Sequence, residues 1–142
     1  MRNVPIATEV INTRTRIEMI DVTELVQKHV RKLAVSEGFL IVYNPHTSAA
    51  ITINENADPD VKSDLLTKLD KLVPQIESYY QHDEGNSDAH VKSSLLGNSV
   101  TVLIEGGRLV LGRWQGIYFC EFDGPRERRM MVKIVDLSQP QS

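Results

Sequence analysis

The amino-acid sequence predicts one α+β domain that is rich in antiparallel strands. Three observations lead to this fold class. The chain has 142 residues, which suits a single domain and is too short for a (β/α)8 barrel of roughly 200 residues or more. Short apolar runs of strand length recur along the chain and are separated by glycine, proline and asparagine turns. Only a few segments have the apolar spacing of an amphipathic helix.

Composition and charge exclude several classes of protein. The 16 Lys and Arg residues and 19 Asp and Glu residues give a net charge of −3, which argues against a general nucleic-acid binder. No apolar run approaches the roughly 20 residues of a membrane span, so we expect no membrane association. The N-terminus lacks the apolar stretch of a secretory signal, so we expect a cytoplasmic protein. A single cysteine excludes an internal disulfide framework and a CxxC zinc module.

The first third of the chain reads as two strands, a helix and a third strand. Short strands are expected at residues 6–11 and 17–20. A helix follows, with Asp21 and Glu24 as a capping box or Thr23 as the cap. Its buried stripe comprises Leu25, Val26, His29, Val30 and Leu33, and Gly38 is expected to end it. Residues 39–43 are a continuous apolar run, which predicts a strand buried on both faces.

The remaining two thirds read as two helices among further strands. Asp58 and Pro59 are typical of a helix start, and Pro74 ends that helix. A short helix is expected over residues 88–96, closed by Gly97. Residues 138–142 form a polar tail that we expect to be frayed. The further strands are expected at residues 48–54, 99–104, 108–111, 115–122 and 129–137.

The four histidines have different surroundings in the sequence. His29 lies on the buried stripe of the first helix and is interpreted as a packing residue. His46 follows a strand in an accessible loop, whereas His82 and His90 lie eight positions apart in an acidic segment. Three imidazoles that leave an open position would match a catalytic zinc site. Spacing alone, however, favours an acidic surface loop with two histidines.

Glu121 and the arginines near the last hairpin are the other candidates for chemistry. Glu121 alternates with Ile117 and Phe119, so it is an acid/base or metal-site candidate if that strand face is buried. If the opposite face is the buried one, Glu121 lies in solvent. Guanidinium groups suit phosphate or carboxylate recognition, although arginines in turns are usually solvated.

Several ordered motifs make the sequence similar to the YjbQ-like family of small proteins, often labelled secondary thiamine-phosphate synthase. The first motif runs from His46 through Thr47 and Ser48 to Val61. The second comprises residues 82–86 and 88–97. The third comprises Gly106, Arg108 and Leu109, residues 112–117, Glu121, and the turn from Gly124 to Arg129. Together these matches span nearly the whole chain.

The resemblance implies a fold and a site that the residue pattern alone does not give. It implies a seven-stranded β-sandwich in two sheets with about three helices, assembled as a homotrimer of one domain over residues 1–142. It also implies that His46, His82 and His90 converge on a divalent metal, with zinc expected and magnesium or another transition metal as alternatives. Glu121 and His46 are the expected catalytic residues. The expected substrate-binding residues are Gln115, Arg128, Thr47 and Ser48.

The family label implies a transferase that joins a pyrimidine pyrophosphate to a thiazole phosphate. We therefore expect a metal-binding enzyme that acts on a small phosphorylated ligand. Two alternatives remain open. One is a metal-dependent hydrolase of a phosphorylated substrate, with Glu121 as general base. The other is a trimer that binds a metal or a metabolite without catalysis.

Overall fold

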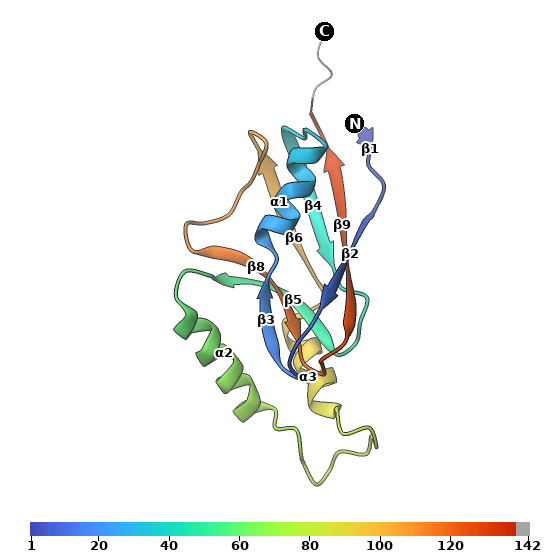
Figure 1. Ribbon diagram of the computed structural model, residues 1–142, viewed down its shortest axis with the longest axis vertical. Helices are drawn as coiled ribbons and strands as arrows, with labels where there is room; N and C mark the ends of the chain where they lie inside the picture. Colours follow the sequence, from blue (N-terminus) through green and yellow to red (C-terminus); the bar gives the residue numbers. More distant parts are fainter. Residues whose placement is uncertain (139–142) are drawn as a thin grey trace.

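Nine strands and three helices make up the computed structural model, which describes residues 1–138 (Figure 1). The α+β class is confirmed. The structure has two strands more than the seven that the resemblance implies. The strand at Arg108–Leu109 falls within the one expected at residues 108–111, whereas the pattern of the sequence does not predict the two-residue strand at Arg2–Asn3. The helices are α1 (Thr23–Lys32), α2 (Pro59–Leu72) and α3 (Ser87–Leu96). The strands are β1 (Arg2–Asn3), β2 (Ala7–Asn12), β3 (Glu18–Asp21), β4 (Glu37–Tyr43), β5 (Ala49–Glu55), β6 (Ser99–Glu105), β7 (Arg108–Leu109), β8 (Gln115–Glu121) and β9 (Glu127–Asp136).

The strands form two sheets in which every pairing is antiparallel. The larger sheet has the order β1-β9-β4-β6-β7, and β2 also pairs with β9. The smaller sheet has the order β3-β8-β5. In the smaller sheet Ala49 pairs with Glu121 at one end and Glu55 pairs with Gln115 at the other. This register places the two ends of β8 on opposite sides of the domain.

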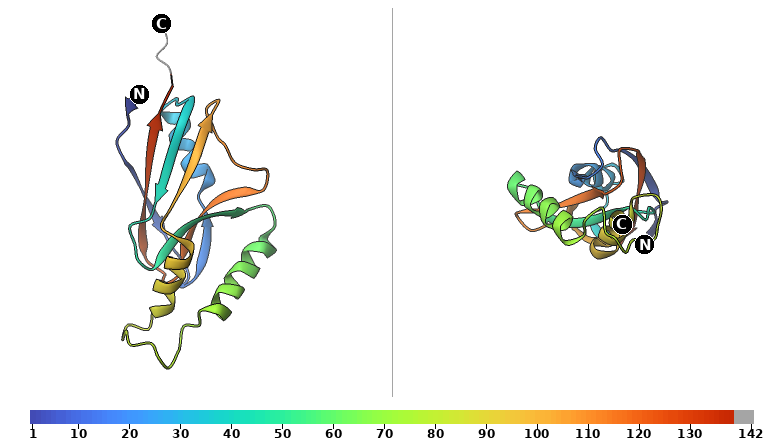
Figure 2. Two further views of the ribbon diagram at one scale, coloured as in Figure 1. Left: turned by 180° about the vertical axis from the view of Figure 1, so that it is seen from behind. Right: turned by 90° about the horizontal axis from the view of Figure 1, so that it is seen from below.

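The main core lies on one face of the larger sheet. The smaller sheet covers one end of this face, and α1 covers the other end (Figures 1 and 2). Val26 and Val30 of α1 are fully buried, as the helical stripe predicts. His29 is on the same helix and its Nε2 lies 2.7 Å from Glu9 Oε1, so it joins α1 to β2. The same core includes Leu40, Val42, Ile51, Val102, Ile117, Phe119, Met130, Val132 and Ile134.

The smaller sheet is buried on both faces. Ile117 and Phe119 face the main core, whereas Tyr118, Cys120 and Phe122 belong to a second cluster with Ala89 of α3. Leucines of α2 are half-buried against this second cluster, although α2 has no buried residue. The middle strand β8 is therefore enclosed between two layers, and every residue from Gly116 to Glu121 is buried. Neither face of β8 leaves Glu121 in solvent.

Among residues 1–138, no helix covers the outer face of the larger sheet (Figure 2). On β4, Leu40 and Val42 are buried, but Phe39 and Ile41 are half-buried and Tyr43 is 40% exposed. The expectation that residues 39–43 are buried on both faces is wrong for the single chain. The reason is that the larger sheet has only one covering layer.

The helix ends follow local sequence signals in part. The expected cap of α1 at Asp21 or Thr23 is wrong, because Val22 is the N-cap and no side chain caps the helix. Asp58 caps α2 by accepting a hydrogen bond from the Asp60 N–H, and Gly97 follows α3 with a φ of 95°. The expected end of α1 at Gly38 is wrong, because Leu33 caps the helix and Gly38 lies inside β4. Within residues 1–138, none of the helices has the length and apolar character required to cross a membrane.

We predict that Gly38→Ala destabilises the fold far more than Gly85→Ala. Both glycines have positive φ, but a Cβ at Gly38 would stand 2.0 Å from the Val135 carbonyl oxygen, whereas nothing lies within 4 Å at Gly85. Gly85→Ala should lower the free energy of unfolding by about 1 kcal/mol, through backbone strain alone. Gly38→Ala should lower the free energy of unfolding by a further 1–3 kcal/mol or more, about the cost of overpacking, because β9 must move to make room for the Cβ. Urea unfolding measures both, and equal losses would contradict the assigned packing.

Candidate functional site

The predicted site residues fall into four places in the structure. Glu121, Arg128 and Ser48 form a buried cluster where the two sheets meet. His46 and Thr47 lie directly outside it, in the loop between β4 and β5. His82 and His90 lie before and on α3. Gln115 lies at the opposite end of β8 from Glu121, and its side-chain oxygen accepts a hydrogen bond from the Gly112 N–H. The register of β8 therefore separates Gln115 from the others.

Glu121 and Arg128 form a buried ion pair. Glu121 is 0% exposed and Arg128 is 3% exposed. Arg128 Nε donates to Glu121 Oε2 over 2.7 Å, and Arg128 Nη2 donates to the other carboxylate oxygen. Glu121 also accepts from the Thr13 hydroxyl and the Asp123 N–H, each over 2.9 Å. Four donors thus engage this carboxylate.

The environment of Glu121 keeps it ionised. Burial by itself raises the pKa of a carboxyl group, but the hydrogen bonds and charge of Arg128 outweigh it, and the pKa of Glu121 lies below its usual 4.5. Because four protein donors occupy both oxygens of this buried carboxylate, we interpret the pair as a structural element.

Arg128 also holds the loop that precedes β5. Its Nη2 donates to the Ser48 hydroxyl over 2.9 Å and to the Ser48 carbonyl over 3.3 Å. Ser48 is buried, and Thr47 and His46 precede it directly. The ion pair therefore positions the accessible loop residues.

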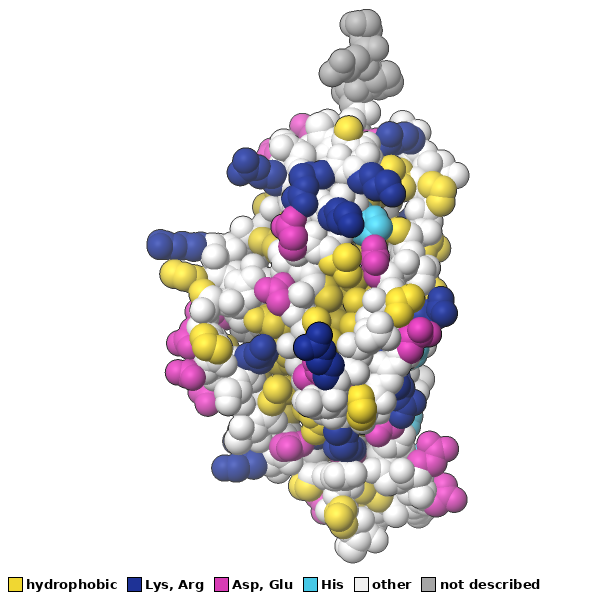
Figure 3. Space-filling model, viewed as in Figure 1, with side chains coloured by type: hydrophobic (Ala, Val, Ile, Leu, Met, Phe, Trp, Pro, Cys, Tyr) yellow, Lys and Arg dark blue, Asp and Glu magenta, His cyan; other side chains and the backbone are white. Residues whose placement is uncertain are grey.

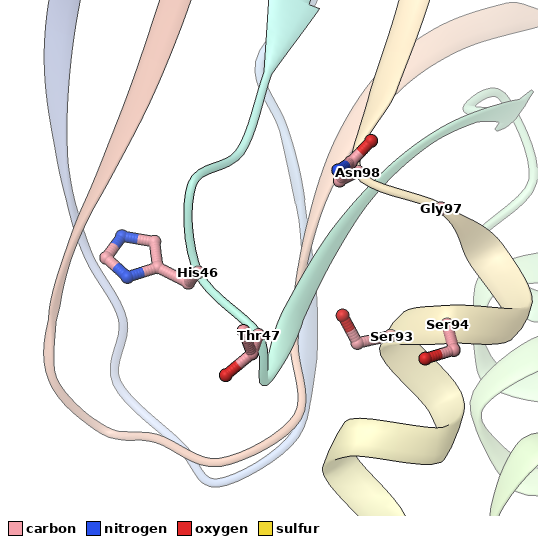
Figure 4. A pocket seen from close by; sticks show the side chains of 6 residues that line it. All are labelled: His46, Thr47, Ser93, Ser94, Gly97 and Asn98. Atoms are coloured by element: carbon pink, nitrogen blue, oxygen red, sulfur yellow. The ribbon is translucent and has the colours of Figure 1, made fainter.

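His46 is a neutral hydrogen-bond acceptor in this arrangement. Its Nε2 accepts the Arg129 backbone N–H over 2.8 Å, so in the neutral ring the proton resides on Nδ1. Burial and then the charge of Arg128 hold the pKa of His46 below its usual 6.5. Figure 4 shows the His46 ring turned away from α3. Neither ring nitrogen of the neutral form has a free lone pair.

The other two histidines lie side by side on the far side of Thr47. His90 Nδ1 lies 3.1 Å from the Thr47 carbonyl oxygen, which only accepts, so this nitrogen carries the proton. The His82 and His90 rings meet edge to face with their centroids 5.7 Å apart, and His82 Nε2 lies 3.4 Å from Glu84 Oε2. The three histidines thus share one region around Thr47 without converging on one point.

The trihistidine metal site is not formed. A catalytic zinc site needs three protein lone pairs aimed at one ion, and His46 supplies none. Among residues 1–138, no group of three or more His, Cys, Asp or Glu side chains is arranged to hold a metal. These residues do not fit the metal that the resemblance implied, because the Arg129 N–H engages the only lone pair of neutral His46 and the described residues hold no group arranged around an ion.

A cavity of about 440 Å³, which we call the α3 pocket, lies between the β4–β5 loop and α3 (Figure 4). Ser93 is fixed by donating to the Ala49 carbonyl, and Ser94 donates to the His90 carbonyl. Within the part of the chain that the structure describes, the Thr47 hydroxyl and the Asn98 carboxamide have no hydrogen-bond partner in the protein. The pocket is lined by His46, Thr47, Ser93, Ser94, Gly97 and Asn98.

Sequence reasoning missed most of the α3 side of this pocket. Ser93, Ser94 and Asn98 were not selected, because serine and asparagine near a helix end are ordinary capping and surface residues. One signal was available in the sequence. His90, Ser93, Ser94 and Gly97 recur at helical spacing on one side of α3, which gives that helix a polar stripe where an apolar one would be expected.

A second polar network joins α3 to its neighbours and was also missed. Lys92 is 1% exposed, and its Nζ donates to Asp88 over 3.0 Å and to Asp70 of α2 over 2.6 Å. Arg16 donates to the other oxygen of Asp88 over 2.9 Å. Burial raises the pKa of Asp88, but the hydrogen bonds from Arg16 and Lys92 outweigh it and leave the pKa lowered. The network anchors α2 and α3 to the sheet.

Comparison with known proteins identifies relatives of the chain. The family model described as "UPF0047 protein YjbQ-like" matches residues 8–137. The chain is 51% identical over 125 residues to the UPF0047 protein YugU of Bacillus subtilis, covering 88% of this chain and 95% of the relative. It is 50% identical to a UPF0047 protein of Methanocaldococcus jannaschii, covering 88% of this chain and 90% of the relative.

Solved structures agree with this fold. An uncharacterized protein of the YjbQ/UPF0047 family from Clostridium acetobutylicum superimposes with a TM-score of 0.88 at 53% identity, covering 91% of this chain and 99% of the other. A protein from Sulfolobus solfataricus, described as YbjQ-like and of unknown function, gives a TM-score of 0.86 at 31% identity, covering 92% of this chain and 95% of the other.

The relatives overturn the expected function. Their names give the family number and no activity, and two of the solved structures are described as uncharacterized or of unknown function. None of these names mentions thiamine-phosphate synthesis or a metal. Together with the unformed trihistidine site, this overturns the expectation of a metal-binding thiamine-phosphate synthase and its metal-dependent alternatives.

We predict that Glu121→Gln lowers the free energy of unfolding by about 3–5 kcal/mol, because it leaves the buried Arg128 charge without a partner. The matched control is Glu127→Gln, which breaks an exposed pair with Arg129 at 3.6 Å and should cost about 1 kcal/mol or less. Urea unfolding at neutral pH compares the two variants.

The same pair should govern part of the acid sensitivity. Since the folded pKa of Glu121 is lowered, its stabilisation is complete above the unfolded value of about 4.5 and is lost as the pH falls through the folded pKa. The wild type should therefore lose more stability below pH 4.5 than Glu121→Gln does. Parallel acid profiles of the two proteins would contradict this role.

Proposed function

Because this chain belongs to the UPF0047 YjbQ-like family, whose named relatives carry no activity, we propose its function from the site itself: it binds a small, uncharged, hydroxyl-rich molecule in the α3 pocket without a metal ion. The observation that carries the proposal is the pocket lining. The lining residues offer hydroxyl and carboxamide groups, and none of them is Lys or Arg.

The local hydrogen bonds support a preorganised site. Ser93 and His90 are fixed by backbone carbonyls of the β5 end and the β4–β5 loop, so the two walls of the pocket are joined. The Thr47 hydroxyl and the Asn98 carboxamide are then available to a ligand. Small-molecule sites are typically preformed cavities in which a few placed polar groups fix the ligand. A phosphate group would find no ion-pair partner in this lining.

We further propose that the protein is a homotrimer whose copies meet through the outer face of the larger sheet. This face carries Phe39 and Ile41 on β4, Leu103 on β6, and Met131 and Val135 on β9. Leu103 is 61% exposed and Tyr43 is 40% exposed in the single chain. Thr101 and Lys133 flank Ile41 on this face. A cluster of exposed apolar side chains such as the rest is typical of a protein interface. A second copy on this face would bury the outward side chains of residues 39–43, as their continuous apolar run predicts.

The binding proposal predicts saturable amide shifts in an NMR titration with D-ribose, centred on Thr47, Ser94 and Asn98 and unchanged by a chelator. Thr47→Val should weaken ribose binding about 3–10-fold, because one hydrogen bond is worth about 0.5–1.5 kcal/mol. Thr67→Val, also at an exposed threonine but on α2, is the matched control and should leave the affinity unchanged. Shifts that appear only after zinc is added, or that lie outside this pocket, would overturn the proposal.

The trimer proposal predicts a mass in light scattering of about three times the 16.0 kDa chain. Leu103→Asp should shift the mass to that of one chain, because a carboxylate in a buried apolar interface is costly. Leu72→Asp on α2, where the leucine is 63% exposed, has a matched exposure and should leave the mass unchanged. A trimer that tolerates Leu103→Asp but dissociates with Leu72→Asp would place the interface elsewhere.

A further inference from the structure

A second cavity lies at the opposite end of β6 from the α3 pocket. Its volume is about 410 Å³, and it is lined by Gln27, Arg31, Gly106, Gly107 and Arg108. Asn98 directly precedes β6 and Gly106 directly follows it, so the seven residues of β6 separate the two cavities by about 23 Å. We call this second cavity the α1 cavity. Unlike the α3 pocket, it is lined by two arginines.

Gln27 holds the backbone on both sides of Arg108. Its Nε2 donates to the Gly107 carbonyl over 3.1 Å, and its Oε1 accepts from the Leu109 N–H over 3.0 Å. The residues before and after Arg108 are therefore both fixed to α1. Arg31 lies one helical turn after Gln27 and approaches the same cavity from the helix.

The turn between β6 and β7 leaves room for a ligand. Gly106 and Gly107 both have positive φ, and a Cβ added at Gly106 would meet nothing within 4 Å. At Gly107 the nearest atom to an added Cβ would be the Val35 carbonyl oxygen at 3.8 Å. The cavity is thus bounded by backbone and by two arginine side chains.

The charge around the α1 cavity is positive although the whole chain is acidic. Exposed basic side chains gather at this end of the molecule over α1 (Figure 3); the described residues there are Lys28, Arg31, Lys32 and Arg108. Part of this charge offsets the carbonyl end of α1, where basic residues are favoured in any helix. Arg108 is not on α1, and among residues 1–138 no carboxylate lies within ion-pair distance of it.

Two carboxylates oppose this charge. Glu24 pairs with Arg31, and Glu105 lies across from Arg108 in the β6–β7 pairing. The Arg31–Glu24 pair is exposed on both sides, and such a pair contributes little. An incoming anion can therefore compete with Glu24 for Arg31. At Arg108 an anion displaces no carboxylate among the described residues, because none forms an ion pair with it.

We propose that the α1 cavity binds a phosphate group, either as free phosphate or as the monoester of a small organic molecule. Two guanidinium groups that reach one cavity from different elements are suited to bidentate recognition of phosphate oxygens. This site takes the phosphorylated ligand that the α3 pocket does not favour. It does not depend on ligand binding at the α3 pocket.

The test is an NMR titration of the intact chain with inorganic phosphate and, separately, with ribose 5-phosphate. Saturable shifts at the amides of Gly106, Gly107 and Arg108 are expected at millimolar phosphate. Arg108→Gln should weaken binding at least tenfold, and Arg108→Lys should retain part of it because the charge remains without the planar fork. Tighter binding of ribose 5-phosphate than of phosphate would identify the monoester as the ligand class.

The matched control is Arg113→Gln. Arg113 is also exposed, and its guanidinium lies 4.6 Å from the Trp114 ring centroid, away from the α1 cavity. This variant should bind phosphate as the wild type does. Equal loss in Arg113→Gln and Arg108→Gln would overturn the proposal, because it would indicate nonspecific charge attraction. Absence of saturable shifts would also overturn it, as would phosphate shifts at Thr47 and Asn98 instead. The ribose titration at the α3 pocket tests the other proposal and does not bear on this one.

Discussion

The buried ion pair between Glu121 and Arg128 is the interaction on which the rest of the structure depends. Glu121 ends the middle strand of the smaller sheet, and Arg128 lies near the start of the strand that runs through the larger sheet. The pair therefore joins the two sheets at the point where their strands meet. Breaking one partner of a buried pair leaves an unpaired charge in a low-dielectric interior, which costs far more than the pair gains over an apolar replacement. Because separating Glu121 from Arg128 is so costly, the two sheets are held in a fixed position at this junction.

That rigidity has consequences for the candidate site. Arg128 also binds Ser48, and so determines where Thr47 and His46 lie. Residues that look catalytic in the sequence are thereby consumed in structural contacts: Glu121 has four donors, and His46 accepts a backbone N–H. What remains available is a polar cavity between a fixed loop and α3. Such a cavity suits recognition of a small molecule better than metal chemistry.

Two cavities of different character lie at the two ends of β6. The α3 pocket is lined by uncharged polar groups, whereas the α1 cavity has two guanidiniums and a glycine turn fixed by Gln27. The outer sheet face between them is apolar and uncovered in the single chain. An assembly of copies through that face would leave the chain with chemically distinct sites separated by a rigid strand.

The sequence by itself determined the α+β class, the helix start at Asp58 and Pro59, the end of α3 at Gly97 and the buried stripe of α1, because these depend on local capping and periodicity. It also selected the loop at His46 and Thr47 that borders the α3 pocket. Only the tertiary structure decided that Gly38 serves a strand contact with Val135, that both faces of β8 are buried and that Gln115 lies far from Glu121. It alone decided where the lone pair of His46 and the ring N–H of His90 are used, because hydrogen bonds to Arg129 and Thr47 join residues distant in the sequence. The pairing register of the strands and the layer of helices over the smaller sheet depend on contacts between distant residues, so no local sequence pattern encodes them.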